Sequence, residues 1–236
     1  LRSYSNDDNF HGITLDTNGQ LSYISRSSGS NDFYLNTTPQ HRDPSAWYHL
    51  VFASDTTQGT AANRFKFYVN GTQITTFDSS TYPAEDFQGR INNDVQQEIA
   101  RLQESGGDGT RESNGYFADV NFIDGAAYDP SYFGQTSSNG VWIPKKYGGS
   151  YGNNGFFLEF QQTGTSANAS GIGADTSGNT HHFTVHNLAA NNVTADTPTN
   201  NFATINPLLT NDGSTHSEGN TKLVTPGGPG ISGPTI

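Results

Sequence analysis

The sequence contains neither cysteine nor methionine in its 236 residues. Without cysteine, the chain can form no disulfide, no zinc–thiolate site and no thiol nucleophile. No apolar run approaches the roughly 20 residues that a transmembrane helix requires, and the first residues do not resemble a signal peptide. Because the sequence begins with Leu1 and not with methionine, we expect a processed or truncated product.

Charged residues are also few, at 14% of the chain, and their signs are unbalanced. The 22 Asp and Glu residues outnumber the 11 Lys and Arg residues, which gives a formal net charge of -11. An acidic surface repels phosphate backbones and anionic lipids. We therefore expect no nucleic-acid partner and no membrane insertion, whereas neutral sugars and divalent cations remain compatible with this charge.

Hydrophobic residues make up only 31% of the sequence, and small polar residues and 27 glycines take their place. Such residues form helices poorly but suit the turns and polar sheet faces of β proteins. The aromatic share of 12% argues against disorder, because disordered chains are poor in aromatics. The composition therefore predicts an all-β protein whose core is filled largely by aromatic side chains.

Two stretches in the first half of the sequence predict β-hairpins. Residues 10–15 and 20–24 flank the turn Asp16-Thr17-Asn18-Gly19, and Asn-Gly between alternating apolar runs is a strong hairpin signal. Residues 47–53 are apolar on both strand faces, which predicts a central strand covered on two sides. A polar loop then leads to an alternating, half-buried strand at residues 65–69.

Other segments give weaker or ambiguous signals. Residues 94–104 place Val95, Ile99 and Leu102 at helical spacing, but residues 98–102 equally fit a strand at a sheet edge, so both alternatives stay open. After the strand at 65–69, the turn Asn70-Gly71 predicts a third strand of the same meander. Further strands are expected at residues 72–77, 116–122, 141–144, 156–160 and 182–186.

The C-terminal region differs in composition from the rest of the chain. From residue 191 to 236, Asn, Thr, Pro and Gly dominate, which predicts an extended linker or tail. Residues 227–235 place glycine at every third position, the spacing that a collagen triple helix needs at its axis. This segment is either the start of a collagen-like stem or a flexible tail.

The stretch from Ser45 to Gly71 resembles the central signature of laminin-G-like, concanavalin A-like lectin domains. Trp47, His49 and Val51 match its first strand, and residues 67–71 (FYVNG) match its second. The resemblance implies an all-β fold, an antiparallel jelly-roll β-sandwich over residues 1–190, with an extended Gly/Pro/Asn/Thr-rich arm over residues 191–236. Because the Trp-rich first strand of such domains has no counterpart here, we expect that strand to be missing or supplied by another chain.

Three shorter stretches are similar to lectin-like surface proteins of tailed phages, especially marine ones. They are residues 121–125 (NFIDG), 140–145 (GVWIPK) and 197–204 (TPTNNFAT). This resemblance implies a non-enzymatic virion surface or fibre protein at the virion surface or in the extracellular space. Its expected partners are glycans or host surface polysaccharide and other virion or filament subunits, and we expect a homo-oligomer, such as a trimer. The alternatives are an extracellular adhesin or filament subunit without sugar binding, and a glycan hydrolase.

The sequence offers little support for an enzyme. Related glucanases use a strand on which two Glu flank an Asp, so that the carboxylates share one face. Glu159 has Phe157 and Gln161 as its same-face neighbours, and no second carboxylate is evident. His181, His182 and His186 crowd one expected strand, where we interpret them as solvent-facing. His49 lies within the family signature and is expected to be a buried, hydrogen-bonded residue.

Calcium is the expected cofactor if the protein has one. Laminin-G-like domains often hold Ca²⁺ at a loop rim, and this ion takes six to eight hard oxygen ligands. The resemblance makes Asp55, in the loop after the Trp47 strand, and Asp108, in a Gly-rich loop, the candidate metal ligands. The loops expected to carry function are residues 54–63, 77–87 and 105–114.

Overall fold

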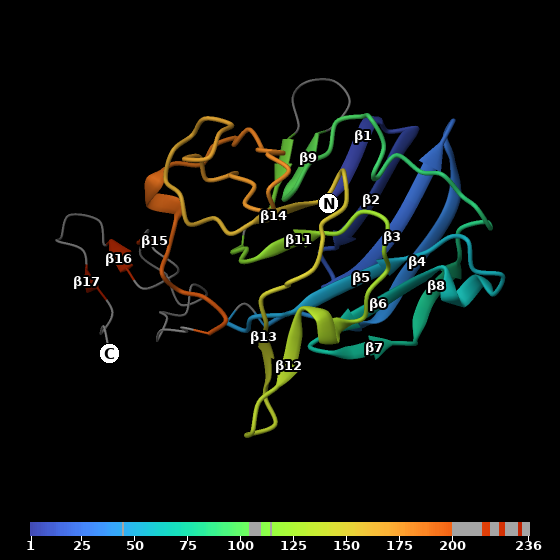
Figure 1. Cartoon of the computed structure of the whole chain (residues 1–236), viewed down its shortest axis with the longest axis horizontal. Coiled ribbons are helices and arrows are strands. Elements are labelled where there is room, and N and C mark those ends of the chain that lie inside the picture. The colour runs from blue at the N-terminus through green and yellow to red at the C-terminus, as the bar shows by residue number, and fades with distance from the viewer. Residues whose placement is uncertain are drawn as a thin grey trace. The chain divides into compact units, whose positions relative to one another are not determined.

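The computed structural model describes residues 1–43, 45–103, 110–113, 115–199, 214–217, 222–224 and 231–232 (Figure 1). Backbone contacts group the chain into two compact units. The first unit comprises residues 1–115 and 126–145, and the second comprises residues 116–125 and 146–236. The domain boundary predicted near residue 190 falls inside the second unit.

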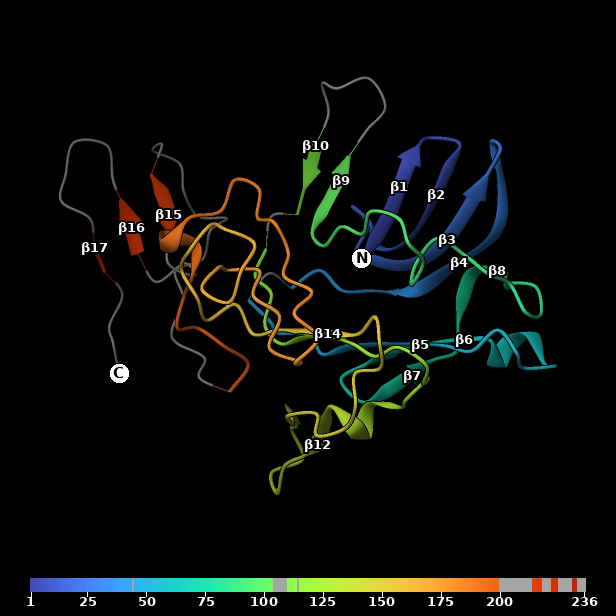
Figure 2. The same ribbon diagram turned by 45° about the horizontal axis from the view of Figure 1, so that its top comes forward.

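A five-stranded antiparallel sheet forms one layer of the first unit (Figure 2). The hairpin predicted for residues 10–24 is its centre. The turn forms as expected, because Asp16 Oδ1 accepts hydrogen bonds from the N–H groups of Asn18 and Gln20, and Gly19 has a φ of 76°. In spatial order the strands are β1 (Arg2–Asn6), β2 (Asn9–Leu15), β3 (Gln20–Ser27), β4 (Ser30–Gln40) and β8 (Phe77–Thr81).

The second layer is a three-stranded sheet in the order β5-β6-β7. Its strands are β5 (Leu50–Ser54), β6 (Phe65–Val69) and β7 (Thr72–Ile74). The prediction that residues 47–53 form a central strand is wrong, since β5 lies at the sheet edge and begins only at Leu50. The apolar run predicted a strand covered on both faces, but at the sheet edge Leu50 remains 36% exposed.

Aromatic side chains from both layers fill the space between the sheets. Tyr23 on β3 and Phe33 on β4 pack against Phe65 and Phe67 on β6. The Tyr23 and Phe65 rings stack with their centroids 3.7 Å apart. Leu21, Leu35 and Ile74 complete this buried cluster. The all-β, antiparallel sandwich and its aromatic core, predicted from composition and alternation, are therefore confirmed.

A two-residue turn joins β6 to β7. Asn70 and Gly71 have φ angles of 48° and 79°, the left-handed pair that tight hairpins require. The Trp142 ring lies directly over Gly71, where an added Cβ would approach it to 2.5 Å. Trp142 belongs to a second hairpin of the first unit, formed by β12 (Gly134–Thr136) and β13 (Trp142–Pro144). The strand expected at residues 141–144 is thus confirmed.

Residues 94–104 form no helix in the described part of the chain. Arg101–Gln103 forms β9, which pairs with β10 (Thr110–Glu112). Glu98 forms an isolated antiparallel bridge with Arg2 through backbone hydrogen bonds of 2.7 and 2.8 Å. Of the two alternatives, the strand at a sheet edge is the better description, because the backbone of residue 98 bonds across to β1. Two single-turn 3-10 helices, η1 (Ala61–Asn63) and η2 (Pro130–Tyr132), also belong to the first unit.

The second unit has shorter strands and longer loops. β11 (Val120–Phe122) pairs with β14 (Phe156–Leu158), and all three residues of β14 are buried. The strand expected at residues 182–186 is wrong, since this segment has no ladder partner within the described residues. The segment is held instead by loop contacts, because Phe183 N donates to Gly173 O at 2.8 Å and His182 Nδ1 accepts a hydrogen bond from Asp175 N. Just before it, the Asp175 carboxylate accepts hydrogen bonds from the N–H groups of Phe157, Ser177 and His181.

The C-terminal region includes three short described strands beyond a 3-10 turn, η3 (Ala190–Asn192). They form a small antiparallel sheet of β15 (Thr215–Ser217), β16 (Lys222–Val224) and β17 (Ile231–Ser232). Most of the Gly-rich segment 227–235 lies outside the described residues. None of the helices in the described part of the chain has the length and hydropathy that a membrane-spanning helix needs.

Candidate functional site

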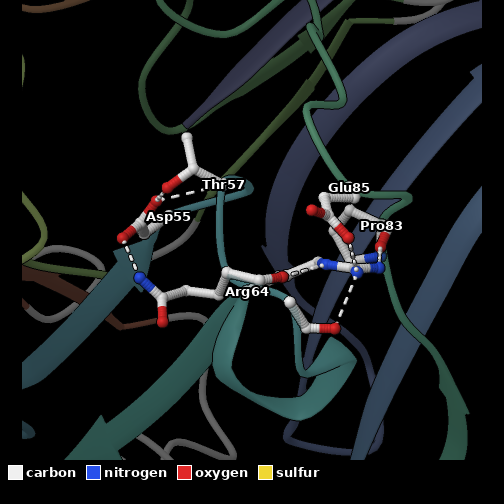
Figure 3. Close-up of polar contacts among 7 residues, drawn as sticks. Asp55, Thr57, Arg64, Pro83 and Glu85 are labelled. Atoms are coloured by element: carbon white, nitrogen blue, oxygen red, sulfur yellow. Dashed lines mark hydrogen bonds and ion pairs between the residues drawn. The ribbon is translucent and has the colours of Figure 1, made fainter.

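The rim loop, residues 54–64, joins β5 to β6 and is fixed at its start by one carboxylate (Figure 3). Asp55 Oδ1 accepts hydrogen bonds from Thr57 N at 3.1 Å and from Thr57 Oγ1 at 2.7 Å, and Oδ2 accepts one from Gln58 Nε2 at 2.6 Å. The sequence Asp-Thr-Thr thereby closes an Asx-turn. The predicted loop at residues 54–63 is confirmed.

Arg64 clamps the rim loop to the segment that follows β8. Its guanidinium donates to the carbonyl oxygens of Gln58 (2.7 Å), Gly59 (3.2 Å) and Pro83 (3.0 Å). It also pairs with Glu85 at 3.1 Å (Figure 3). The Arg64 side chain is 12% exposed and that of Glu85 is 56% exposed. The bonds to carbonyl oxygens therefore hold the clamp, because an ion pair with one exposed partner stabilises little.

A second tie joins the same two segments. Asp86 N donates to Thr56 O at 2.9 Å, and Thr56 Oγ1 donates to Phe87 O at 3.1 Å. The rim is thus built from residues 54–64 and 82–87. The prediction of a loop over residues 77–87 is wrong for its first part, because residues 77–81 pair with β4 as strand β8. Of the third predicted loop, residues 105–114, residues 110–112 form strand β10, and residues 105–109 and 114 lie outside the described residues.

Asp55, the first predicted calcium ligand, is hydrogen-bonded at both carboxylate oxygens. Hydrogen bonds from Thr57 and Gln58 lower the pKa of Asp55 below its usual value, so the carboxylate is charged. Three donors already occupy the carboxylate, two on Oδ1 and one on Oδ2, so of its four lone-pair sites one, on Oδ2, is left for a cation. No group of three or more His, Asp or Glu residues that could hold a metal occurs among the described residues. The calcium ligand role of Asp55 stays a prediction, and Asp108 lies outside the described residues.

The face of the five-stranded sheet that points away from the core also carries aromatic rings. The register pairs Tyr4 with Phe10 and Ile24 with Tyr34, on the side opposite Tyr23. The Arg2 guanidinium carbon lies 4.1 Å from the centroid of the Phe10 ring and 4.9 Å from that of Tyr4, a cation–π geometry. These side chains are half-buried. The alternation of side chains within each strand places these residues on one face of their own strand. Only the pairing of the strands shows that they share one surface.

A family model of the concanavalin A-like lectin/glucanase superfamily matches residues 2–130, which is more than half of the chain. The chain belongs to this superfamily. The match covers every strand of the two packed sheets, so the jelly-roll sandwich expected from the Ser45–Gly71 resemblance is confirmed. No curated protein and no solved structure was found to match the chain. The resemblance to phage surface proteins stays a prediction.

The superfamily signature residue His49 lies near β5 and is half-buried. Burial lowers the pKa of His49, and a hydrogen bond with the backbone of Phe133 opposes this effect. The His49 and Trp142 rings lie 5.7 Å apart between centroids. The prediction of a hydrogen-bonded histidine is therefore confirmed, but the prediction that it is buried is wrong, since its side chain is only half-buried. His49, which directly precedes β5, thus contacts the β12–β13 hairpin through the Trp142 ring and lies beside it through the backbone of Phe133.

A different histidine, His11 on β2, is the deeply buried one, with 3% of its surface exposed. Its Nδ1 accepts hydrogen bonds from the backbone N–H groups of Arg90 and Ile91, each at 3.1 Å. Burial lowers the pKa of His11 to about 4, with a smaller opposing effect of Asp32. A neutral imidazole thus anchors residues 90–91 to the core. The sequence did not single out His11. The one signal was that His11 shares a strand face with the apolar residue Ile13, and that pattern does not distinguish a buried histidine from an exposed one.

The clustered histidines of the second unit do not form a strand face. His182 Nδ1 accepts a hydrogen bond from Asp175 N at 3.0 Å, and His181 Nε2 lies 2.9 Å from Asn153 O. The interpretation of these histidines as solvent-facing strand residues is wrong for His182, which is half-buried and bonded to the loop backbone. These contacts stabilise loops and gather no metal-ligand cluster within the described residues.

The superfamily includes glucanases, and glycoside hydrolysis generally uses a pair of neighbouring carboxyl groups. In the second unit, Lys146 Nζ lies 3.7 Å from Glu159 Oε1. Loss of hydration raises the pKa of Asp119, the negative charge of Glu159 raises it further, and Lys146 opposes both. Glu159 therefore has a carboxylate neighbour that the sequence did not reveal, since 40 residues separate the two positions. Their spacing in the sequence gave no signal for this pair.

Proposed function

We propose that the protein is a non-enzymatic carbohydrate-recognition module, carried on a virion surface or fibre, where it attaches to glycans or host surface polysaccharide. The superfamily match over residues 2–130 carries this proposal. The rim supports it further, because Arg64 and Asp55 hold two loops in a fixed arrangement at one end of the strands β5 and β6. Loops positioned by a rigid scaffold are where binding residues concentrate.

The virion setting rests on the three phage-like stretches at residues 121–125, 140–145 and 197–204. In that setting the partners are glycans and other virion subunits, and the protein is a homo-oligomer such as a trimer. Weak sugar contacts become effective through avidity when several copies are linked. The location is accordingly the virion surface or the extracellular space.

A glycan hydrolase is the second candidate, and one observation favours it. The raised pKa of Asp119 beside Glu159 is the pattern in which one carboxyl stays protonated as an acid while the other is ionised. Against this role, Lys146 already pairs with Glu159. Release of reducing ends from glucans by the wild-type chain, and its loss in Glu159→Gln, would establish hydrolysis.

The proposal is tested by glycan-array binding of the full chain, first with Ca²⁺ and then with a chelator. Binding in both conditions supports a lectin that does not need metal, and loss of binding with the chelator supports the calcium prediction at Asp55. If no immobilised glycan is bound in either condition, carbohydrate recognition is wrong. The remaining alternative is then an adhesin or filament subunit without sugar binding. Asp55→Asn serves as the matched variant for the calcium arm, because asparagine retains an oxygen for the Asx-turn but loses the charge.

A further inference from the structure

Two tyrosines in the first unit stack on each other outside the core. The rings of Tyr128 and Tyr132 have centroids 4.1 Å apart and an interplanar angle of 26°. Tyr132 is 45% exposed, and Tyr128 is half-buried. Because Tyr128 covers one face of the Tyr132 ring, Tyr132 is held as a rigid plate at the surface.

Polar groups surround this stacked pair. Asp129 lies between the two tyrosines in sequence and is exposed, and one of its oxygens accepts a hydrogen bond from Ser131 N at 2.8 Å. Lys145 Nζ donates to the carbonyl oxygen of Ser131. The charge of Asp129 also raises the pKa of Tyr68 on β6, after a larger effect of burial. The stacked rings, the Asp129 carboxylate and the Lys145 ammonium group therefore lie close together, since Asp129 and Lys145 both bond to the backbone of Ser131.

The fold itself does not require the exposed ring of Tyr132. The buried cluster between the sheets is complete without it, and the η2 turn is closed by Asp129 and Pro130, which are a favoured N-cap and first residue. Large exposed aromatics supported by a neighbouring ring are the kind of side chain that binding surfaces use, because little conformational entropy is lost on contact.

We infer that the Tyr128–Tyr132 pair and Asp129 form a contact site for a neutral saccharide. The C–H groups on one face of a sugar ring are weakly positive, and the face of an aromatic ring is negative, so the two stack favourably. The Asp129 carboxylate accepts hydrogen bonds from sugar hydroxyls, and the Lys145 ammonium group donates to sugar oxygens. This inference rests on the proposed carbohydrate-binding function and adds the place and the class of sugar.

The saccharide is assigned as neutral because of charge. The carboxylate of Asp129 stands beside the ring plate, and the whole chain carries a net charge of -11. An acidic sugar would meet repulsion both at long range and at the site. A sugar with free hydroxyls and no carboxylate, sulfate or phosphate fits the groups present.

The test compares four variants with the wild-type chain on immobilised neutral oligosaccharides of glucose, galactose, mannose and N-acetylglucosamine, with acidic oligosaccharides on the same array. Tyr132→Ala is expected to weaken binding about tenfold, which corresponds to about 1.4 kcal/mol. Tyr132→Phe keeps the ring and should stay within about twofold. Asp129→Asn keeps an N-cap residue but removes the charge, and we expect a loss of about threefold to tenfold.

Tyr116→Ala is the matched control, because Tyr116 is 44% exposed and lies in the second unit. Binding should not change in this variant. Thermal unfolding of every variant shows whether folding is intact. If Tyr132→Ala does not fold, NMR spectra of ring-labelled tyrosines in the wild-type chain take the place of that variant. The signals of Tyr128 and Tyr132 are expected to shift when an oligosaccharide that binds on the array is added.

The outcomes separate this inference from the proposed function. Wild-type binding to neutral glycans that Tyr132→Ala loses and Tyr116→Ala retains would support the site. Wild-type binding that Tyr132→Ala leaves unchanged overturns the site and leaves carbohydrate recognition intact. Binding to acidic glycans alone overturns the assignment of a neutral sugar, and no binding to any glycan refutes the proposed function together with this site.

Discussion

In the first unit the chain buries aromatic side chains between two sheets, whereas in the second unit polar side chains bind the backbone of long loops. Phe33 and Phe67 are fully buried in the first unit. In the second, Asp175 accepts three backbone N–H groups, and Asn179 Nδ2 donates to the carbonyl oxygens of Gly152 and Gly155, each at 2.8 Å. The strands β11 and β14 of that unit pair over only three residues each.

This difference shows two ways in which a chain with little hydrophobic content can be held. Apolar burial is non-directional, and it tolerates changes that keep volume and shape. Side-chain bonds to backbone are directional, and a buried N–H that loses its acceptor costs the full desolvation of that group. The first unit should therefore respond to changes of volume, and the second to changes of hydrogen-bonding capacity.

The largest effect is expected from Phe67→Ala in the first unit. Phe67 contacts Phe52, Phe65 and Phe77, and its loss leaves a cavity between the sheets. We expect a loss of about 3–5 kcal/mol in the free energy of unfolding, measured by urea denaturation. Hydrogen exchange should rise in β3, β4 and β6. Phe67→Leu is the control and should cost less, because it fills most of the volume.

A pH titration tests how the first unit holds residues 90–91. The pKa of His11 is about 4 in the folded chain, against an ordinary value of 6.5. As the pH falls, His11 is protonated in the unfolded chain before it is protonated in the folded chain. The contribution of neutral His11 to the free energy of unfolding is therefore fully present above about pH 6.5 and is lost as the pH drops to about 4. Since one pKa unit corresponds to about 1.4 kcal/mol, the total is about 3 kcal/mol.

The measurement is urea denaturation at several pH values for the wild-type chain and for His11→Gln. Glutamine offers a neutral acceptor to Arg90 N and Ile91 N and does not titrate. The groups that face His11 electrostatically are Asp32, which favours its protonation, and Arg90, which opposes it. Equal slopes of stability against pH for the two proteins would contradict the role given to His11.

A smaller and more local effect is expected from Asp175→Asn in the second unit. Burial raises the pKa of Asp175, but hydrogen bonds from Phe157, Ser177 and His181 together lower it below its usual value. The amide of asparagine replaces one acceptor oxygen with a donor, so one N–H loses its partner. We expect a cost of about 2 kcal/mol, with faster hydrogen exchange at residues 157, 177 and 181 than elsewhere.

The control for this variant is Asp7→Asn, which removes the same charge from an exposed carboxylate that accepts a hydrogen bond from the Tyr4 hydroxyl. Its unfolding free energy should change by less than about 0.5 kcal/mol. A similar loss in both variants would show that net charge, and not the hydrogen-bonded loop, determines the effect.

The smallest effect is expected from Arg64→Lys at the rim. A lysine ammonium lacks the planar fork that reaches Gln58, Gly59 and Pro83 together, so we expect a cost of about 1 kcal/mol and faster exchange in residues 55–64. Glu85→Ala isolates the exposed ion pair and should cost less than about 0.5 kcal/mol. If Glu85→Ala costs as much as Arg64→Lys, the ion pair and not the carbonyl contacts forms the clamp.

Local patterns predicted the parts of the fold that local interactions decide. The turns at residues 16–19 and 70–71 formed as expected, because Asx hydrogen bonds and left-handed glycine are encoded within four residues. The alternation at residues 65–69 likewise predicted which side chains of β6 are buried. The jelly-roll signature then extended these local features to a superfamily.

Features set by distant pairing were not accessible from the sequence. Residues 77–81 were expected in a loop, yet backbone hydrogen bonds to β4 make them a strand. Residues 182–186 alternate like a strand but lack a pairing partner among the described residues, and loop contacts to Asp175 fix them instead. The neighbours of Glu159 and the tyrosine stack at residues 128 and 132 also depend on three-dimensional placement that no spacing rule supplies.

The interleaving of the two units has a consequence for how such proteins can be recombined. The chain passes from one unit to the other at residues 115–116, 125–126 and 145–146. A fragment ending at residue 145 would retain β11 without its partner β14. Exchange of loops or modules between homologous genes therefore preserves both units only if residues 116–125 travel with the segment after residue 145. The smallest transferable block of this protein is larger than the 2–130 segment that the superfamily match covers.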